Sequence, residues 1–249
     1  MSGHSKWSTI KRQKGVADAQ RGAVFTKISK EIIMAVKAGG GDPNANFRLR
    51  LVLQKAKENN MPNENIERAI KRATGGGEGA DLQEITYEGY GPAGTAVIVE
   101  AATENRNRTV AEVRNVFART GGNLGETGSV GWIFELRGVI SVAPNGKDPD
   151  EVALYAIDAG AVDVQVGDDA IDVYTQPADL EAVKKALEDN GVPVASAETA
   201  RVPKTTVQLD EKHAIQTLRL VEKLEALDDV QKVYFNAEFS DDVLASYTS

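Results

Sequence analysis

The chain has 249 residues, 41% of them hydrophobic, and a formal net charge of −8, a length that suits two or three domains of about 100 residues each. It contains no cysteine, which excludes disulfide bonds, thiolate metal sites and cysteine nucleophiles. No apolar run approaches the roughly 18 residues of a membrane span, and the opening MSGHSKWSTIKRQK lacks the apolar core of a secretory signal. We therefore expect a cytoplasmic protein that does not contact membranes.

The charge is distributed unevenly along the chain. Residues 1–80 hold 15 Lys and Arg against 7 Asp and Glu, whereas the remainder holds 14 against 30. Within residues 1–37 the count is 8 against 2, and like charges at that density repel one another unless a polyanion neutralises them. The asymmetry predicts a basic nucleic-acid-binding module joined to an acidic body, although a solvated helix face is the alternative for any single lysine.

Residues 1–79 are interpreted as a basic arm followed by a helical domain. Residues 1–17 show no hydrophobic periodicity, while from Asp18 apolar residues recur at helical spacing until the glycines at 39–41. A second helix is expected to open at Pro43 and a third at Pro62, the latter closed by the glycine-rich stretch 75–79. The pattern predicts a three-helix bundle.

Beyond residue 80 the pattern becomes that of strands and helices. Strands are expected at 84–88, 95–102 and 129–136, with a helix at 109–119. Residues 138–203 form a β-α-β-β-α-β unit of the ferredoxin-like type. Residues 80–137 and 204–249 would together make a second such unit. The predicted class is α+β: a helical domain and two ferredoxin-like domains, one inserted in the other.

Catalytic and metal-binding patterns are weak in this sequence. His4 and His213 lack ligand spacing, the glycine-rich segments lack the Lys-Ser/Thr ending of a P-loop, and most carboxylates of 148–190 alternate with Val or Ile as on a solvated strand face. We expect no metal, no cofactor, no small-molecule substrate and no enzymatic activity. An enzyme with an acidic cleft is the alternative.

Two constellations suggest binding to phosphates. The first is the arm with the helical domain, where Trp7 could stack on an unpaired base or plug the bundle. The second is Asn105–Thr109 at a helix N-terminus, where Arg106 and Arg108 could bind an anion or pair with carboxylates of their own domain. Lys37 shares the face of Lys27 and Lys30. The candidate nucleic-acid-binding residues are Lys6, Trp7, Lys11, Arg12, Lys14, Arg21, Lys27, Lys30, Arg68, Lys71, Arg72, Arg106 and Arg108.

Several long strings resemble the YebC family. They are GHSKWSTIKRQK, DAQRGAVFTK, MPNENIERAIKRATG, YEGYGPAG, ENRNRT and TGGNLGETGSVGWIFE. The resemblance covers nearly the whole chain, with the distinctive strings in residues 1–136. It implies a three-domain cytoplasmic protein without known enzymatic activity. Members are commonly described as DNA-binding transcriptional regulators, whereas a mitochondrial member and some others resemble translation factors at the ribosome, with a link to proline-rich stretches.

Two functions follow from these observations. The first is a DNA-binding transcriptional regulator that binds duplex DNA through the basic helical domain. The alternative is a translation factor that associates with rRNA and the ribosome and assists the synthesis of proline-rich stretches. Phosphate contacts serve DNA and RNA alike, so charge does not separate the two.

Overall fold

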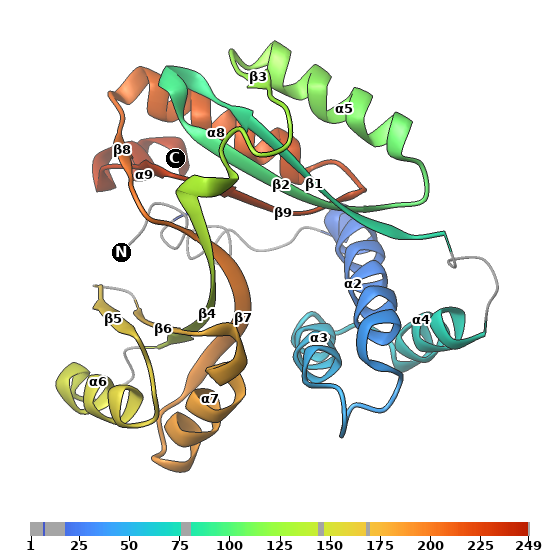
Figure 1. Cartoon of the computed structure of the whole chain (residues 1–249), viewed down its shortest axis with the longest axis vertical. Helices are drawn as coiled ribbons and strands as arrows, with labels where there is room; N and C mark the ends of the chain where they lie inside the picture. The colour runs from blue at the N-terminus through green and yellow to red at the C-terminus, as the bar shows by residue number, and fades with distance from the viewer. Residues whose placement is uncertain (1–6, 8–17, 76–80, 144–146, 168–169, 249) are drawn as a thin grey trace.

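The computed structural model describes residue 7 and residues 18–75, 81–143, 147–167 and 170–248. The described chain forms a helical bundle and two sheet-containing lobes, with the long first helix of the bundle directed toward the upper sheet (Figure 1). The α+β class predicted from the sequence is confirmed. Among the described residues, no helix is long and apolar enough to cross a membrane.

The helical bundle consists of α2 (Asp18–Gly39), α3 (Phe47–Glu58) and α4 (Asn63–Thr74). Its core is a stripe of aliphatic side chains from all three helices, including the fully buried Ile32 and Leu49. The second helix begins four residues after the expected Pro43. The reason is Asn46, whose side chain accepts the Leu49 N–H at 3.0 Å and donates to the carbonyl of Ala35 at 2.8 Å. This N-cap fixes the start of α3 and ties it to α2.

The first sheet has the order β3-β1-β2-β9 and is antiparallel throughout. Helices α5 and α8 cover one face through a core that includes Phe117, Leu218 and Val99. The strands and helices of this lobe are β1 (Gln83–Tyr90), β2 (Ala96–Thr103), α5 (Arg106–Arg119), β3 (Asn123–Leu124), β8 (Val207–Gln208), α8 (Glu211–Glu225), β9 (Val230–Phe235), β10 (Ala237–Glu238) and α9 (Asp241–Thr248). Two single-turn 3-10 segments, Pro92–Gly94 and Gly131–Ile133, lie in its loops.

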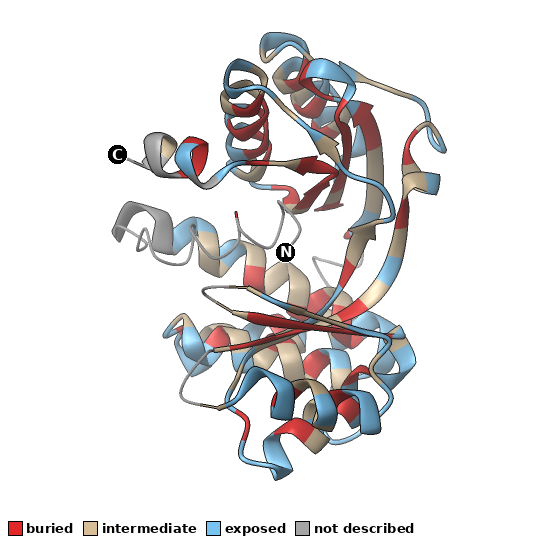
Figure 2. Cartoon of the chain, turned by 90° about the vertical axis from the view of Figure 1, so that its left-hand side faces the viewer, coloured by how far each residue is buried: buried red, intermediate tan, exposed pale blue. Residues whose placement is uncertain are grey.

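The second sheet has the order β5-β6-β4-β7, with every neighbouring pair antiparallel. This is the predicted ferredoxin-like order. The elements are β4 (Phe134–Val142), α6 (Pro149–Asp158), β5 (Asp163–Val166), β6 (Ile171–Thr175), α7 (Leu180–Asp189) and β7 (Val194–Pro203), with a 3-10 turn at Pro177–Asp179. Burial follows the layers in both lobes: the helices are buried on one side and exposed on the other, while the central strands β2 and β6 are buried along nearly their whole length (Figure 2).

The strand order of the first sheet differs from the expected ferredoxin-like order. The segment predicted as strand 129–136 is a 3-10 turn followed by β4, which runs unbroken to Val142 and pairs along its whole length with β7 of the second sheet. Residues 204–249, expected to complete the same unit, begin with the two-residue β8, which pairs in parallel with β10 rather than with the sheet. The physical reason is that β4 pairs with β7 over its whole length, so residues 134–137 extend a strand of the second sheet instead of joining the first. The same two strands also connect the lobes.

The bundle also contacts the second lobe. Phe47 and Leu51 of α3 pack against the core under the second sheet. Arg50 pairs with Glu181 on α7, and its guanidinium lies 5.4 Å from the centroid of the Phe47 ring. Helix α3 therefore sits beside α7, as Figure 1 shows.

Candidate nucleic-acid interface

The lysines of α2 that were predicted to face nucleic acid point toward the first sheet lobe instead. Lys27 donates to the carbonyl of Glu225 at 2.5 Å. Lys37 donates to the carbonyl of Leu82 at 3.0 Å, and Lys30 donates to Asp229 at 2.6 Å. These three side chains attach the bundle to the loop after α8 and to the start of β1. Their amines are engaged within the molecule, so this face of α2 is not an open phosphate-binding surface.

Asp229 is the centre of this attachment and is only 3% exposed. Its Oδ1 accepts from Lys30, and its Oδ2 accepts from Arg108 at 2.7 Å, from Thr109 at 2.7 Å and from Thr103 at 3.0 Å. Burial alone raises the pKa of Asp229, but the hydrogen bonds from Arg108, Lys30 and Thr109 outweigh burial and hold the pKa well below its usual range. We call these five residues the Asp229 cluster.

The Asp229 cluster joins the two constellations that were predicted to bind phosphates. Lys30 comes from the helical bundle and Arg108 from the first turn of α5. Arg108 therefore pairs with a carboxylate of its own domain, Asp229, which was one of the two alternatives expected for it. The Arg108 side chain is nevertheless 54% exposed, so its remaining N–H groups face solvent at the start of α5.

A second contact joins the C-terminal end of α4 to the start of α5. Arg72 donates to Glu104 at 2.9 Å, and both side chains are more than 40% exposed. Glu104 immediately precedes Asn105, the N-cap of α5, whose side chain accepts the Arg108 N–H at 3.1 Å. Arg68 and Lys71 of α4 and Arg106 of α5 are exposed. The Arg72–Glu104 pair thus brings the exposed cations in the last turns of α4 close to those in the first turn of α5.

The exposed side of α5 continues this surface. Its buried stripe is Thr109, Val113 and Phe117, so residues on the opposite side of the helix face solvent. Arg114 and Arg119 are exposed there. Neither was among the residues predicted from the sequence, although a helical projection around the apolar stripe would have found both. We call Arg68, Lys71, Arg72, Arg106, Arg108, Arg114 and Arg119 the α4–α5 surface.

Trp7 is 4% exposed and therefore does not offer a ring to a base in this structure. The plug alternative fits its burial, but the partner is not the helical bundle. The indole packs in the core of the first sheet lobe, with its ring centroid 6.0 Å from that of Tyr247 on α9, and its Nε1 donates to Glu225 at 3.3 Å. The predicted Lys6, Lys11, Arg12 and Lys14 lie outside the described residues, and so does the side chain of Arg21.

The comparisons with known proteins identify the family. A model described as the TACO1/YebC protein N-terminal domain matches residues 5–76, and one described as the TACO1/YebC second and third domain matches residues 82–237. The chain belongs to the TACO1/YebC family. The resemblance to YebC proteins seen in the sequence strings is thereby confirmed.

Relatives of this TACO1/YebC chain match it over its full length. It is 55% identical to a "probable transcriptional regulatory protein" of Dehalococcoides mccartyi, covering 100% of this chain and 99% of the relative. It is 56% identical to a protein of the same description from Herpetosiphon aurantiacus, covering 99% and 98%. A crystal structure of a conserved hypothetical protein from Aquifex aeolicus superposes with a TM-score of 0.84 at 47% identity, covering 91% of this chain and 94% of that one.

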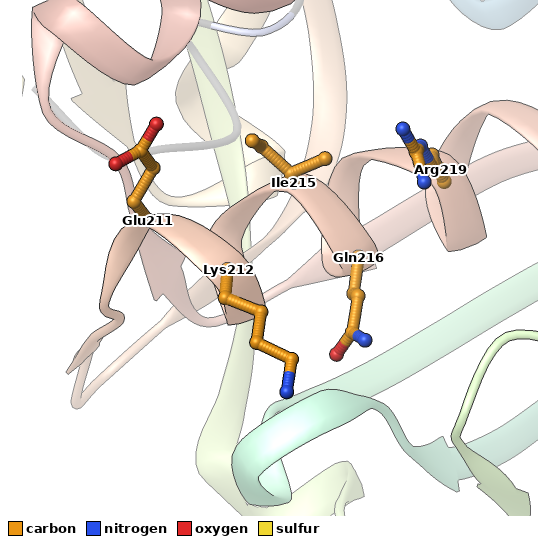
Figure 3. Close-up of a pocket in the computed structure, with 5 residues that line it drawn as sticks. All are labelled: Glu211, Lys212, Ile215, Gln216 and Arg219. Atoms are coloured by element: carbon orange, nitrogen blue, oxygen red, sulfur yellow. The ribbon is translucent and has the colours of Figure 1, made fainter.

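One further hollow and one histidine of this TACO1/YebC chain lie on α8. Figure 3 shows a shallow hollow along one exposed side of α8, lined by Glu211, Lys212, Ile215, Gln216 and Arg219. His213 lies in the first turn of α8, where its ring Nδ1 is 2.7 Å from the carboxylate of the N-cap residue Asp210. Within the part of the chain that the structure describes, no group of three or more His, Asp or Glu side chains is arranged to hold a metal ion.

Proposed function

We propose that this protein is a non-enzymatic, cytoplasmic regulator of gene expression that binds nucleic acid through the α4–α5 surface. The observation that carries the proposal is the contact between Arg72 and Glu104, which brings the basic end of α4 next to the N-terminus of α5. Exposed cations on two elements held at fixed spacing suit a phosphate backbone, and free backbone N–H groups in the first turn of α5 suit an anion.

Duplex DNA is the partner that the relatives favour, since those at 55–56% identity are described as probable transcriptional regulatory proteins. Binding to DNA through this surface would be largely electrostatic, because the α4–α5 surface consists of Arg and Lys side chains that can neutralise phosphates. The basic arm would add further cations to the same nucleic acid.

A second candidate is a translation factor that binds rRNA at the ribosome. It is favoured by the charge of the lobe built on the second sheet, in which residues 148–183 contain ten Asp and Glu and no Lys or Arg. A lobe with that charge is repelled by a long duplex that extends past the α4–α5 surface. A ribonucleoprotein particle exposes both RNA and basic protein, so RNA could bind the α4–α5 surface while basic protein meets the acidic lobe.

The test measures the salt dependence of binding by fluorescence anisotropy, with a labelled 20-base-pair DNA duplex and a structured rRNA hairpin as separate probes. The Arg114→Ala/Arg119→Ala chain should bind more weakly, and the slope of log K against log salt should fall by about 0.9 per lost contact on DNA. Lys184→Ala/Lys185→Ala on α7 is the matched control, because it removes two charges that pair with Glu188 and Asp189 of the same helix.

The outcomes separate the proposal from its rivals. A lowered slope only in the α5 variant supports binding at the α4–α5 surface, and the probe bound more tightly at physiological salt selects DNA or RNA. An equal loss in the α7 control would mean that net charge alone governs binding. No binding of either probe by the full chain would refute the proposed function.

A further inference from the structure

The outer edge of the ferredoxin-like lobe carries an apolar surface that the proposed function does not use. Seven large hydrophobic side chains of the described chain are strongly exposed, and four of them lie on α6, on β5 and at the residue just before β5. Their exposed fractions are 57% for Leu154, 58% for Ile157, 47% for Val162 and 56% for Val166. We call these four residues the α6–β5 patch. Singly exposed aliphatic residues are ordinary on protein surfaces, whereas a group of them on adjoining elements marks a contact surface.

The four side chains come from two adjoining segments of the lobe. Leu154 and Ile157 are three residues apart on α6 and therefore share a side of the helix. Val162 and Val166 alternate with Val164, which contacts the core beneath the sheet, so all three point to the side of the sheet that α6 covers. Helix α6 and strand β5 lie next to each other at the lower left of Figure 1.

The patch ends at an open strand. Among the residues that the structure describes, β5 is the last strand of its sheet and pairs only with β6. Its outer edge therefore presents backbone N–H and C=O groups beside the exposed valines. Exposed edges of this kind are places where another polypeptide segment can pair.

The surroundings of the patch are strongly negative. Glu151 and Asp158 lie three residues before and four residues after Leu154, so they flank it on the same side of α6. Both are exposed, and neither forms an ion pair with the described part of the chain. The segment 148–183 that contains the patch has ten carboxylates and no cation. The rim of the α6–β5 patch is therefore uncompensated negative charge.

We propose that the α6–β5 patch docks a basic amphipathic segment of another protein. Aliphatic side chains of the partner would cover Leu154 and Ile157, while its Lys and Arg side chains would meet Glu151 and Asp158. A nucleic acid does not fit, because its phosphates are repelled by the same carboxylates. A second copy of this chain fits poorly, because a two-fold contact would place the acidic rim against itself. The inference does not depend on the proposed nucleic-acid function.

The experiment uses the full chain and three labelled synthetic 14-residue peptides made of two residue types each. The first has Leu on one helical face and Lys on the other, the second has the same composition in scrambled order, and the third has Glu in place of Lys. Anisotropy titrations at physiological salt should show the tightest binding for the first peptide. Leu154→Ser/Ile157→Ser should weaken it about tenfold or more, since each buried aliphatic side chain contributes a sizeable share of the affinity.

Two control variants accompany this test. Trp132→Ser/Leu136→Ser removes two other exposed hydrophobic side chains, 68% and 51% exposed, and should leave the affinity unchanged. Glu151→Gln/Asp158→Asn should weaken binding and flatten its salt dependence. Because Leu154 and Ile157 are exposed, the Leu154→Ser/Ile157→Ser chain should unfold at the same temperature as the wild type, which separates a lost docking surface from a lost fold.

Several results would overturn the proposal. Equal affinity of the wild type and the Leu154→Ser/Ile157→Ser chain would show that the patch is not the binding surface. Equal binding of the scrambled or the Glu-containing peptide would remove the amphipathic or the charge requirement. Sedimentation that reveals a wild-type dimer, lost in Leu154→Ser/Ile157→Ser, would assign the patch to a second copy of this chain.

Discussion

Replacing Asp229 by Asn tests whether the Asp229 cluster holds the helical bundle against the first sheet lobe. The amide keeps the size of the side chain and still accepts hydrogen bonds from Thr103 and Thr109, but it loses the negative charge shared by Lys30 and Arg108. The side chains of Asp229 and Lys30 are 4% and 18% exposed, so this pair is poorly hydrated. The Arg108 side chain is 54% exposed, so losing its ion pair with Asp229 costs less stability, because water can solvate the guanidinium instead.

The expected cost of Asp229→Asn is about 2–4 kcal/mol in the free energy of unfolding. It comes from the poorly hydrated ion pair with Lys30, whose amine loses its carboxylate, and from the solvent-screened ion pair with Arg108. Urea unfolding followed by circular dichroism measures it. Asp228→Asn, at the exposed neighbouring position, is the matched control. The double variant with Lys30→Met should cost less than the sum of the single changes by about 1–2 kcal/mol. A change below about 0.5 kcal/mol for Asp229→Asn would refute the reasoning, since that is the range of ordinary surface substitutions.

The pH dependence follows from the lowered pKa of Asp229. A carboxylate whose pKa is lower in the folded than in the unfolded state stabilises the fold fully above its unfolded pKa of about 3.9, and the contribution is lost as pH falls toward the folded value. The stability difference between the wild type and Asp229→Asn should therefore be constant from about pH 5 to 7 and shrink below about pH 4. A difference that stays constant down to about pH 2 would contradict the charge-based account.

Three further predictions concern buried residues. Glu88, 7% exposed, accepts backbone N–H groups of Gly128, Val130 and Gly131 at 2.6–2.8 Å, so Glu88→Gln should lower stability by about 1–3 kcal/mol and loosen this loop, seen as faster amide exchange at 128–131. Gly138→Ala should destabilise by at least about 2 kcal/mol in thermal unfolding, because the new Cβ would lie 2.1 Å from Thr175 Oγ1, whereas Gly22→Ala, with open space around it, should not. In a Trp132→Phe chain, the fluorescence of the buried Trp7 should resist acrylamide, while in a Trp7→Phe chain the 68% exposed Trp132 should be quenched readily. Equal quenching of the two would contradict the burial of Trp7.

The helical bundle and the ferredoxin-like lobe were predictable because they follow local patterns. Amphipathic spacing after Asp18 and the alternation around Ile171 each report which side of an element is buried. The order of the first sheet was not predictable. A break near Arg137 looked like a boundary between two strands, and only pairing with β7 makes Phe134–Val142 one strand. Pairing partners distant in sequence leave little trace in a single sequence.

The candidate site was predictable in composition but only partly in geometry. The segment Asn105–Thr109 was singled out by its arginines at a helix start, and Arg106 and Arg108 lie there. Lys27, Lys30 and Lys37 were grouped by helical spacing, which shows that they share a face but not what that face meets. Their partners, the carbonyls of Glu225 and Leu82 and the carboxylate of Asp229, lie 45 to 199 residues away along the chain. Charge spacing along one helix therefore cannot distinguish a docked face from an open one.

The most direct test of the central claim is to map the bound nucleic acid by site-specific photo-cross-linking. Ala111 is exposed on α5 between Arg108 and Arg114, and Ala182 is equally exposed on α7 of the acidic lobe. Each is replaced in turn by a photoreactive phenylalanine derivative, and the full chain is irradiated with the labelled duplex or hairpin. Binding through the α4–α5 surface predicts a cross-link from position 111 and none from position 182. Cross-linking from 182 but not from 111 would contradict the account.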